Sequence, residues 1–169
     1  PSHCSELEAL GNEWAGRFAF EASAVGKHPG YAVLNFNPAA LAHASVLAEV
    51  NQIDYLDNRE TIDISVVSLD DVFSKSPPES IDLIKIDVEG YEVEVLDGAS
   101  CTIEAYEPTF IQVEFNLHQL YRGHTLKSIA DKLPGYEVFQ LLPRGWARRD
   151  PNAASSNVFA FSNFVFKKA

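Results

Sequence analysis

The chain has 169 residues, of which 46% are hydrophobic and 22% are charged, and its formal net charge is −11. This length and balance predict one globular domain with a buried core. The acidic balance disfavours nucleic acid and anionic membranes as partners, and the sequence shows neither an apolar run of roughly 20 residues nor a signal peptide.

The N-terminal third predicts a helix followed by a β-hairpin. Apolar residues recur at helical spacing over residues 2–14. Residues 18–25 and 31–36 have the composition of strands, and the glycine and proline residues between them favour a tight turn. Residues 37–58 are rich in alanine but give no clear pattern.

The rest of the chain alternates predicted strands with predicted helices, which is an α/β pattern. Apolar or β-branched runs predict strands, and apolar periodicity predicts helices. The last two strands are joined by a polar loop without a helix, which predicts an antiparallel end of the sheet. The strands are expected at 62–67, 83–88, 109–115, 136–142 and 158–166, and the helices at 69–73, 91–96, 99–106 and 125–133.

Polar side chains follow two neighbouring predicted strands. Asp87 and Glu89 end the strand 83–88, and Glu114 ends the next one, with Asn116 and His118 directly after it. Ligands of open parallel sheets bind beyond the carboxyl ends of the strands, and buried carboxylates need a partner. We therefore expect the two strands to be adjacent and parallel in the middle of a mixed sheet. Their acids should open into one cleft, with at least one carboxylate partly exposed.

Structural roles are open for each of these residues. Asp87 and Glu89 would suit the N-terminus of the following helix, and Lys85 shares a strand face with Asp87, which favours a buried ion pair. Glu114 would pair with Lys85 or an arginine, and His118 would lie at the surface. Cys4 and Cys101 are far apart in the sequence and are expected to be reduced thiols of a cytoplasmic protein.

Residues 81–99 are the most distinctive stretch of the chain, with the sequence IDLIKIDVEGYEVEVLDGA. This stretch resembles the signature of FkbM-type methyltransferases, which is an apolar strand, Lys-x-Asp-x-Glu-Gly, an acid two residues later and Leu-x-Gly-Ala. Other stretches resemble the family's flanking strands and turns in the same order, so the resemblance spans nearly the whole chain. These stretches are residues 24–26 with Gly30, 67–71, 111–114 and 135–139.

The resemblance implies a fold and an activity. The fold would be a Rossmann-like class I methyltransferase, a three-layer α/β sandwich with a mostly parallel sheet and an antiparallel C-terminal hairpin. The cofactor would be S-adenosylmethionine, and the acceptor would be a hydroxyl group of a small molecule or a sugar. The protein would be a cytoplasmic enzyme with no nucleic-acid or membrane partner.

The resemblance also implies roles for particular residues. Asp87 would lie next to the methionine end of the cofactor, and Glu114 or His118 would be the base or the substrate anchor. Glu89 and Asn116 are expected to contact the acceptor. The residues expected at the cofactor are Pro1, Ala24, Val25 and Asp87.

Two features of the family are not found in the chain, namely the glycine-rich first loop and the acid that ends the second strand. Pro1 resembles the residue directly after that acid, and the chain contains no methionine. We therefore expect residues 1–169 to be the C-terminal two-thirds of a methyltransferase domain, with the first strands and most of the cofactor pocket upstream. A remnant that does not bind the cofactor is the alternative.

Two other functions stay open. Asp87-Val88-Glu89 is similar to the acidic triplet of a metal-dependent glycosyltransferase, since hard cations prefer oxygen ligands. The Gly-Tyr-Glu helix start that follows argues against this, and the main interpretation includes no metal. The other function is that of a non-catalytic, degenerate Rossmann-like domain retained for interaction, because a fold does not establish an activity.

Overall fold

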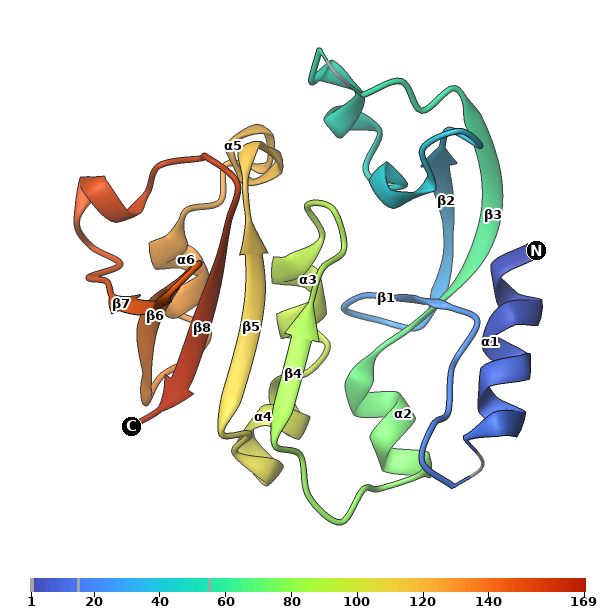
Figure 1. The fold of residues 1–169 in the computed structure, drawn as a ribbon, viewed down its shortest axis with the longest axis horizontal. Helices are drawn as coiled ribbons and strands as arrows, with labels where there is room; N and C mark the ends of the chain where they lie inside the picture. The colour runs from blue at the N-terminus through green and yellow to red at the C-terminus, as the bar shows by residue number, and fades with distance from the viewer. Residues whose placement is uncertain (1, 15, 55) are drawn as a thin grey trace.

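The structure is a computed structural model that describes residues 2–14, 16–54 and 56–169, and it contains two β-sheets with helices beside them (Figure 1). The strand orders are β1-β3-β2 and β4-β5-β8-β6-β7. The strands are β1 (Ala24–Val25), β2 (Gly30–Phe36), β3 (Glu60–Val67), β4 (Leu83–Ile86), β5 (Phe110–Phe115), β6 (Tyr136–Leu142), β7 (Gly145–Arg148) and β8 (Ser162–Lys168).

The α-helices are short, apart from the first. They are α1 (Ser2–Glu13), α2 (Leu69–Lys75), α3 (Glu92–Asp97), α4 (Ser100–Tyr106), α5 (Leu117–Arg122) and α6 (Leu126–Ala130). Three 3₁₀ turns are η1 (Leu41–His43), η2 (Ala48–Gln52) and η3 (Ala154–Ser156). Across the described ranges, none of the helices combines the length and apolar character needed to cross a membrane.

The five-stranded sheet confirms one half of the expected architecture and corrects the other. β4 and β5 are adjacent and parallel, as predicted, and β6 pairs antiparallel with β8. The sheet is not mostly parallel, because the β5–β8, β8–β6 and β6–β7 pairs are all antiparallel. β4 was expected in the middle of the sheet. Among the described residues β5 is the one strand that pairs with it, so β4 forms an edge, where Leu83 is 54% exposed. β7 and α5 were not predicted.

The main core lies on one face of the five-stranded sheet. Alternate residues of β4 and β5 point into it, since side chains along a strand alternate between the two faces. Helices α3 and α6 cover this face with buried apolar residues. The core includes Ile84, Ile86, Ile111, Val113, Phe115, Phe166, Val95, Leu96, Leu126 and Ile129.

The three-stranded sheet corrects the predicted hairpin. β1 pairs parallel with β3, and β2 pairs antiparallel with the opposite side of β3. The strand expected over residues 18–25 is therefore only two residues long, and β3 lies between the two strands that were expected to pair. The backbone hydrogen bonds expected within a hairpin are made to β3 instead.

The small sheet is anchored against the turn between α3 and α4 by a close backbone approach. A Cβ atom at Gly98 would lie 2.1 Å from the carbonyl oxygen of Gly26, so the contact requires glycine at position 98. The Asp70 carboxylate of α2 accepts hydrogen bonds from the backbone N–H groups of Cys101 and Thr102 at the start of α4. These contacts place β1 beside the loop that follows β4.

Candidate functional site

The ends of β4 and β5 bring three predicted carboxylates together. Ile86 of β4 is level with Val113 of β5, so the acids that follow them lie side by side, Asp87 directly after β4 and Glu114 within the last residues of β5. One carboxylate oxygen from each of Asp87, Glu89 and Glu114 lies within 4.8 Å of the other two. The Asp87 side chain is 42% exposed, whereas Glu114 is buried. The acids of the two strands therefore lie together and one of them is accessible, as expected, while a cleft shared by them stays a prediction.

The backbone after Asp87 turns sharply in a left-handed conformation. Glu89 has φ of 51° and Gly90 has φ of 102°. Positive φ is uncommon for a residue with a side chain, and it recurs at functional sites. The Ser45 hydroxyl donates a hydrogen bond of 2.9 Å to the Glu89 carbonyl oxygen. A Cβ atom at Gly90 would lie 3.0 Å from the Cβ atom of His118, so glycine also allows α5 to approach.

A buried bridge joins the loop after β4 to the loop after β5. Glu92, 1% exposed, accepts hydrogen bonds from the backbone N–H groups of Val88 (3.3 Å) and Gly90 (3.2 Å) through Oε1. Its Oε2 accepts a hydrogen bond of 2.6 Å from Gln119 Nε2. Gln119 Oε1 in turn accepts one of 2.7 Å from the backbone N–H of Asn116. The bridge therefore fixes the distance between the two loops.

Sequence reasoning missed both members of this bridge. Glu92 is the acid two residues after Glu89-Gly90 in the recognised signature, so a signal was present, but no role followed from it. Gln119 had no signal except its position three residues after Asn116, where a capping-box partner is common. Asn116 caps α5 with its side chain and also donates a hydrogen bond of 3.2 Å to Glu114 Oε1.

The three carboxyl groups differ in their electrostatic surroundings. The Lys85 ammonium group, 2.5 Å from Asp87 Oδ2, lowers the pKa of Asp87 below its ordinary value. Burial raises the pKa of Glu114 to about 8, helped by the neighbouring Asp87 carboxylate and the negative charge of Glu89. Burial and the charges of Asp87 and Glu92 raise the pKa of Glu89 to about 7. The site thus holds one ionised and two readily protonated carboxyl groups.

His118 lies behind this cluster and is 2% exposed. Its Nδ1 is 3.1 Å from Glu89 Oε2 but outside hydrogen-bond geometry, and neither ring nitrogen has a hydrogen-bond partner among the described residues. Burial, with a contribution from His43, lowers the pKa of His118, so the ring is neutral. The alternative of a surface role for His118 is wrong.

The other structural alternatives have mixed outcomes. Lys85 pairs with Asp87, as considered, but the pair is exposed rather than buried. The hydrogen-bond partner that the structure gives to Glu114 is Asn116, not Lys85 or an arginine.

Two of the residues expected at the cofactor, Ala24 and Val25, line a cavity of about 230 Å³ with Ser45, Val88 and Tyr91, next to the loop after β4. Pro1 lies outside the described residues.

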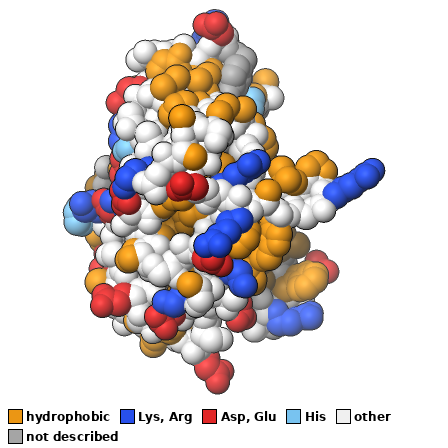
Figure 2. Space-filling view, turned by 90° about the vertical axis from the view of Figure 1, so that its left-hand side faces the viewer, with side chains coloured by type: hydrophobic (Ala, Val, Ile, Leu, Met, Phe, Trp, Pro, Cys, Tyr) orange, Lys and Arg blue, Asp and Glu red, His pale blue; other side chains and the backbone are white. Residues whose placement is uncertain are grey.

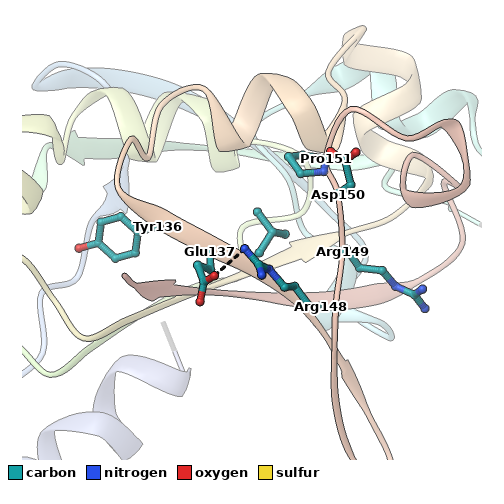
Figure 3. Close-up of a pocket in the computed structure, with 7 residues that line it drawn as sticks. Tyr136, Glu137, Arg148, Arg149, Asp150 and Pro151 are labelled. Carbon is teal, nitrogen blue, oxygen red and sulfur yellow. Dashed lines mark ion pairs between the residues drawn. The ribbon is translucent and has the colours of Figure 1, made fainter.

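A second cavity, of about 470 Å³, lies beside β6 and β7 (Figure 3). Its charged groups pair with each other or with nearby polar groups: Arg148 points to Glu137 at 2.6 Å, and Arg149 donates to Gln140. Glu137 is level with Lys167 of β8, which is level with Phe110 at the start of β5. This cavity therefore lies at the opposite end of β5 from the carboxylates.

The fold and the carboxylates at its strand ends define an α/β protein with a candidate site between two loops. The sequence model described as "Methyltransferase FkbM domain" matches residues 8–142. The chain belongs to this family, as the sequence resemblance indicated.

Two known proteins share parts of this chain. A "2-O-methyltransferase NoeI" from Sinorhizobium fredii (strain NBRC 101917 / NGR234) is 39% identical over 85 residues, which are 50% of this chain and 34% of that protein. The crystal structure of Methyltransferase FkbM from Methylobacillus flagellatus KT has a TM-score of 0.53 and 15% identity, covering 97% of this chain and 32% of that one. At this identity the second likeness shows the fold alone. The matched regions span about a third of the length of both relatives.

Proposed function

We propose that this chain is part of an S-adenosylmethionine-dependent O-methyltransferase that acts on a hydroxyl group of a small molecule or sugar. The observation that carries the proposal is the meeting of Asp87, Glu89 and Glu114 at the ends of two adjacent parallel strands. Membership of the FkbM family supports methyl transfer. The name of the 2-O-methyltransferase relative supports oxygen as the methylated atom.

The described residues fit one part of the cofactor. When bound, S-adenosylmethionine supplies a methyl group carried on a positively charged sulfur. The cavity beside Ala24, Val25 and Tyr91 is mostly apolar and, at about 230 Å³, smaller than the roughly 300–1,000 Å³ of a typical ligand pocket. It suits a portion of the cofactor, and the neighbouring carboxylates favour a cation.

The carboxylates suit the acceptor in two different ways. Asp87 is ionised and accessible, so it would accept a hydrogen bond from the acceptor hydroxyl and orient it. Glu114 Oε1 is engaged by Asn116, but Oε2 has no hydrogen-bond partner among the residues described. We assign Glu114 as the group that takes up the hydroxyl proton, reached through the accessible Asp87 carboxylate beside it, because a pKa of about 8 is close to the working pH of a general base.

The expected accessory roles follow from the same contacts. Glu89 lies between Glu114 and His118 and would contact the acceptor, while Asn116 holds Glu114 and would act through it. His118 is too deeply buried to reach an acceptor directly, so its role as a base would require the Glu89 side chain to relay the proton.

A binding and transfer experiment tests the proposal. Calorimetry of the full-length protein that contains this chain should show S-adenosylmethionine binding, and radiolabelled cofactor should methylate at least one member of a panel of glycosides with single hydroxyl groups blocked. Asp87→Asn should remove transfer, while circular dichroism and urea unfolding stay close to those of the unaltered protein. Absence of cofactor binding in the folded full-length protein would favour the non-catalytic alternative.

A further inference from the structure

The three carboxylates of the candidate site are arranged as ligands of one metal ion would be. Oxygen ligands lie roughly 2.0–2.6 Å from Mg²⁺ or Ca²⁺, so oxygens around one ion are roughly 3–5 Å apart. The oxygens of Asp87, Glu89 and Glu114 lie within 4.8 Å of one another. They come from the loop after β4 and from the last residues of β5, and the buried Glu92–Gln119 hydrogen bond links the helices that follow, α3 and α5. The ligand spacing therefore exists before any ion binds.

Acidic residues often cluster without binding a cation, so the surroundings of the cluster decide the case. His118 is almost fully buried, faces Glu89 with Nδ1 at 3.1 Å, and has no hydrogen bond at either ring nitrogen among the described residues. Glu114 is also buried, and its Oε2 lacks a hydrogen-bond partner there. Buried polar groups are normally satisfied, so unsatisfied groups beside one another indicate a missing ligand.

Charge leads to the same conclusion. Lys85 pairs with Asp87 on the exposed side of the cluster. Glu92, the first residue of α3, adds a fourth carboxyl group next to the loop that follows β4. A divalent ion would stabilise the ionised form of the three carboxyl groups and offset the repulsion that arises when they are ionised together.

We propose that Asp87, Glu89 and Glu114 bind one hard divalent cation, Mg²⁺ or Mn²⁺, with His118 supporting Glu89 from behind. Ligating carboxylates commonly accept a hydrogen bond from a neighbouring side chain, and His118 Nδ1 is close enough to donate one. This site uses the same three carboxyl groups as the proposed function, but cation binding requires neither a methyl donor nor an acceptor and is therefore tested separately. It also differs from the sequence-based expectation of a site without metal.

The test is Mn²⁺ binding to the purified protein after dialysis against EDTA, followed by electron paramagnetic resonance and calorimetry. We expect one saturable Mn²⁺ per chain, displaced by Mg²⁺, and a rise in melting temperature on binding. Asp87→Asn and Glu114→Gln should each weaken binding at least about tenfold, since each removes a charged ligand. Asp82→Asn, an exposed acid at the other end of β4, is the matched control and should bind Mn²⁺ normally.

Two results would overturn the site. One is the absence of saturable Mn²⁺ binding in a folded protein. The other is equal binding by all three variants, which would show diffuse attraction to an acidic surface. The methyl-transfer proposal fails separately. Mn²⁺ binding without cofactor binding would support the cation site and contradict methyl transfer. Transfer that persists in EDTA would support methyl transfer and show that the reaction does not need the cation.

Discussion

The loops after β4 and β5 and the cavity beside β6 and β7 both gather charged side chains, but they hold them differently. In the cavity, Arg148 and Glu137 form an exposed pair, and this side of the molecule carries a mixture of basic and hydrophobic side chains (Figures 2 and 3). At the loops, three carboxylates face one another, and the groups behind them are buried and partly unsatisfied. The carboxyl cluster holds the groups with the larger pKa shifts, because burial and mutual repulsion raise the pKa of Glu89 to about 7 and that of Glu114 to about 8.

The comparison shows that the volume of a cavity does not indicate where the carboxyl groups with shifted pKa values lie in this molecule. An ion pair exposed to water contributes little to the free energy of folding, because solvent screens its charges. Carboxyl groups that lie this close together must be held in place by the surrounding structure, and here the Glu92–Gln119 hydrogen bond links the two segments that carry them. Four experiments can break or sharpen this contrast.

The largest expected effect is on activity. Asp87→Asn should lower kcat/KM for methyl transfer by about 10²- to 10⁴-fold, because it removes the accessible charge at the site. Arg148→Ala, in the other cavity, should change kcat/KM by less than about threefold, since exposed pairs contribute little. Initial-rate kinetics on both variants would measure this. Comparable losses in the two variants would mean that the β6–β7 cavity also takes part.

The next effect is on stability. Glu92→Ala should lower the free energy of unfolding by about 3 kcal/mol or more, because three donors lose their buried acceptor. Glu137→Ala should cost about 0–1 kcal/mol, as expected for an exposed ion pair. Urea unfolding of both variants compares the two regions directly. A small cost at Glu92 would show that the loops are held by other contacts.

A pair of glycine substitutions isolates the packing around the site. Gly90 and Gly145 both have positive φ, but a Cβ atom at Gly90 would meet His118 at 3.0 Å, whereas Gly145 has open space. Gly145→Ala should cost about 1–2 kcal/mol from backbone strain, and Gly90→Ala about 3 kcal/mol because contact with α5 adds to it. Thermal unfolding measures both. Equal costs would contradict the tight approach of α5 to the loop.

The smallest effect is a difference in titration. Glu114 has a pKa raised to about 8 by burial and by Asp87 and Glu89, whereas hydrogen bonds from Asn152 lower the pKa of Asp150 in the other cavity. Since the pKa of Glu114 is raised on folding, its stabilising contribution is complete below about 4.5 and is lost as pH rises through about 8. Carbon-13 carboxyl titrations in metal-free buffer would show both shifts. A Glu114 carboxyl that titrates near 4.5 would remove the assigned base.

The amino-acid sequence by itself determined the elements that depend on local pattern. The apolar run that ends at Asp87 and the one that ends at Glu114 each predict a buried strand followed by an acid. Because both strands are apolar and joined by helices, their parallel pairing followed, and with it the meeting of the two acids. The family signature over residues 81–99 also depends on contiguous residues, so it was readable without a structure.

Tertiary structure decided what depends on partners far apart in the sequence. β3 separates β1 from β2, and β4 lies at an edge of its sheet. The backbone N–H and C=O groups of a strand can pair with any neighbouring strand, so the local sequence does not specify the partner. The Glu92–Gln119 bridge joins residues 27 positions apart, and the burial of His118 depends on its packing against Gly90. Local sequence sets which groups can donate or accept a proton. Their pKa values and their distances arise only when the chain brings the two loops together.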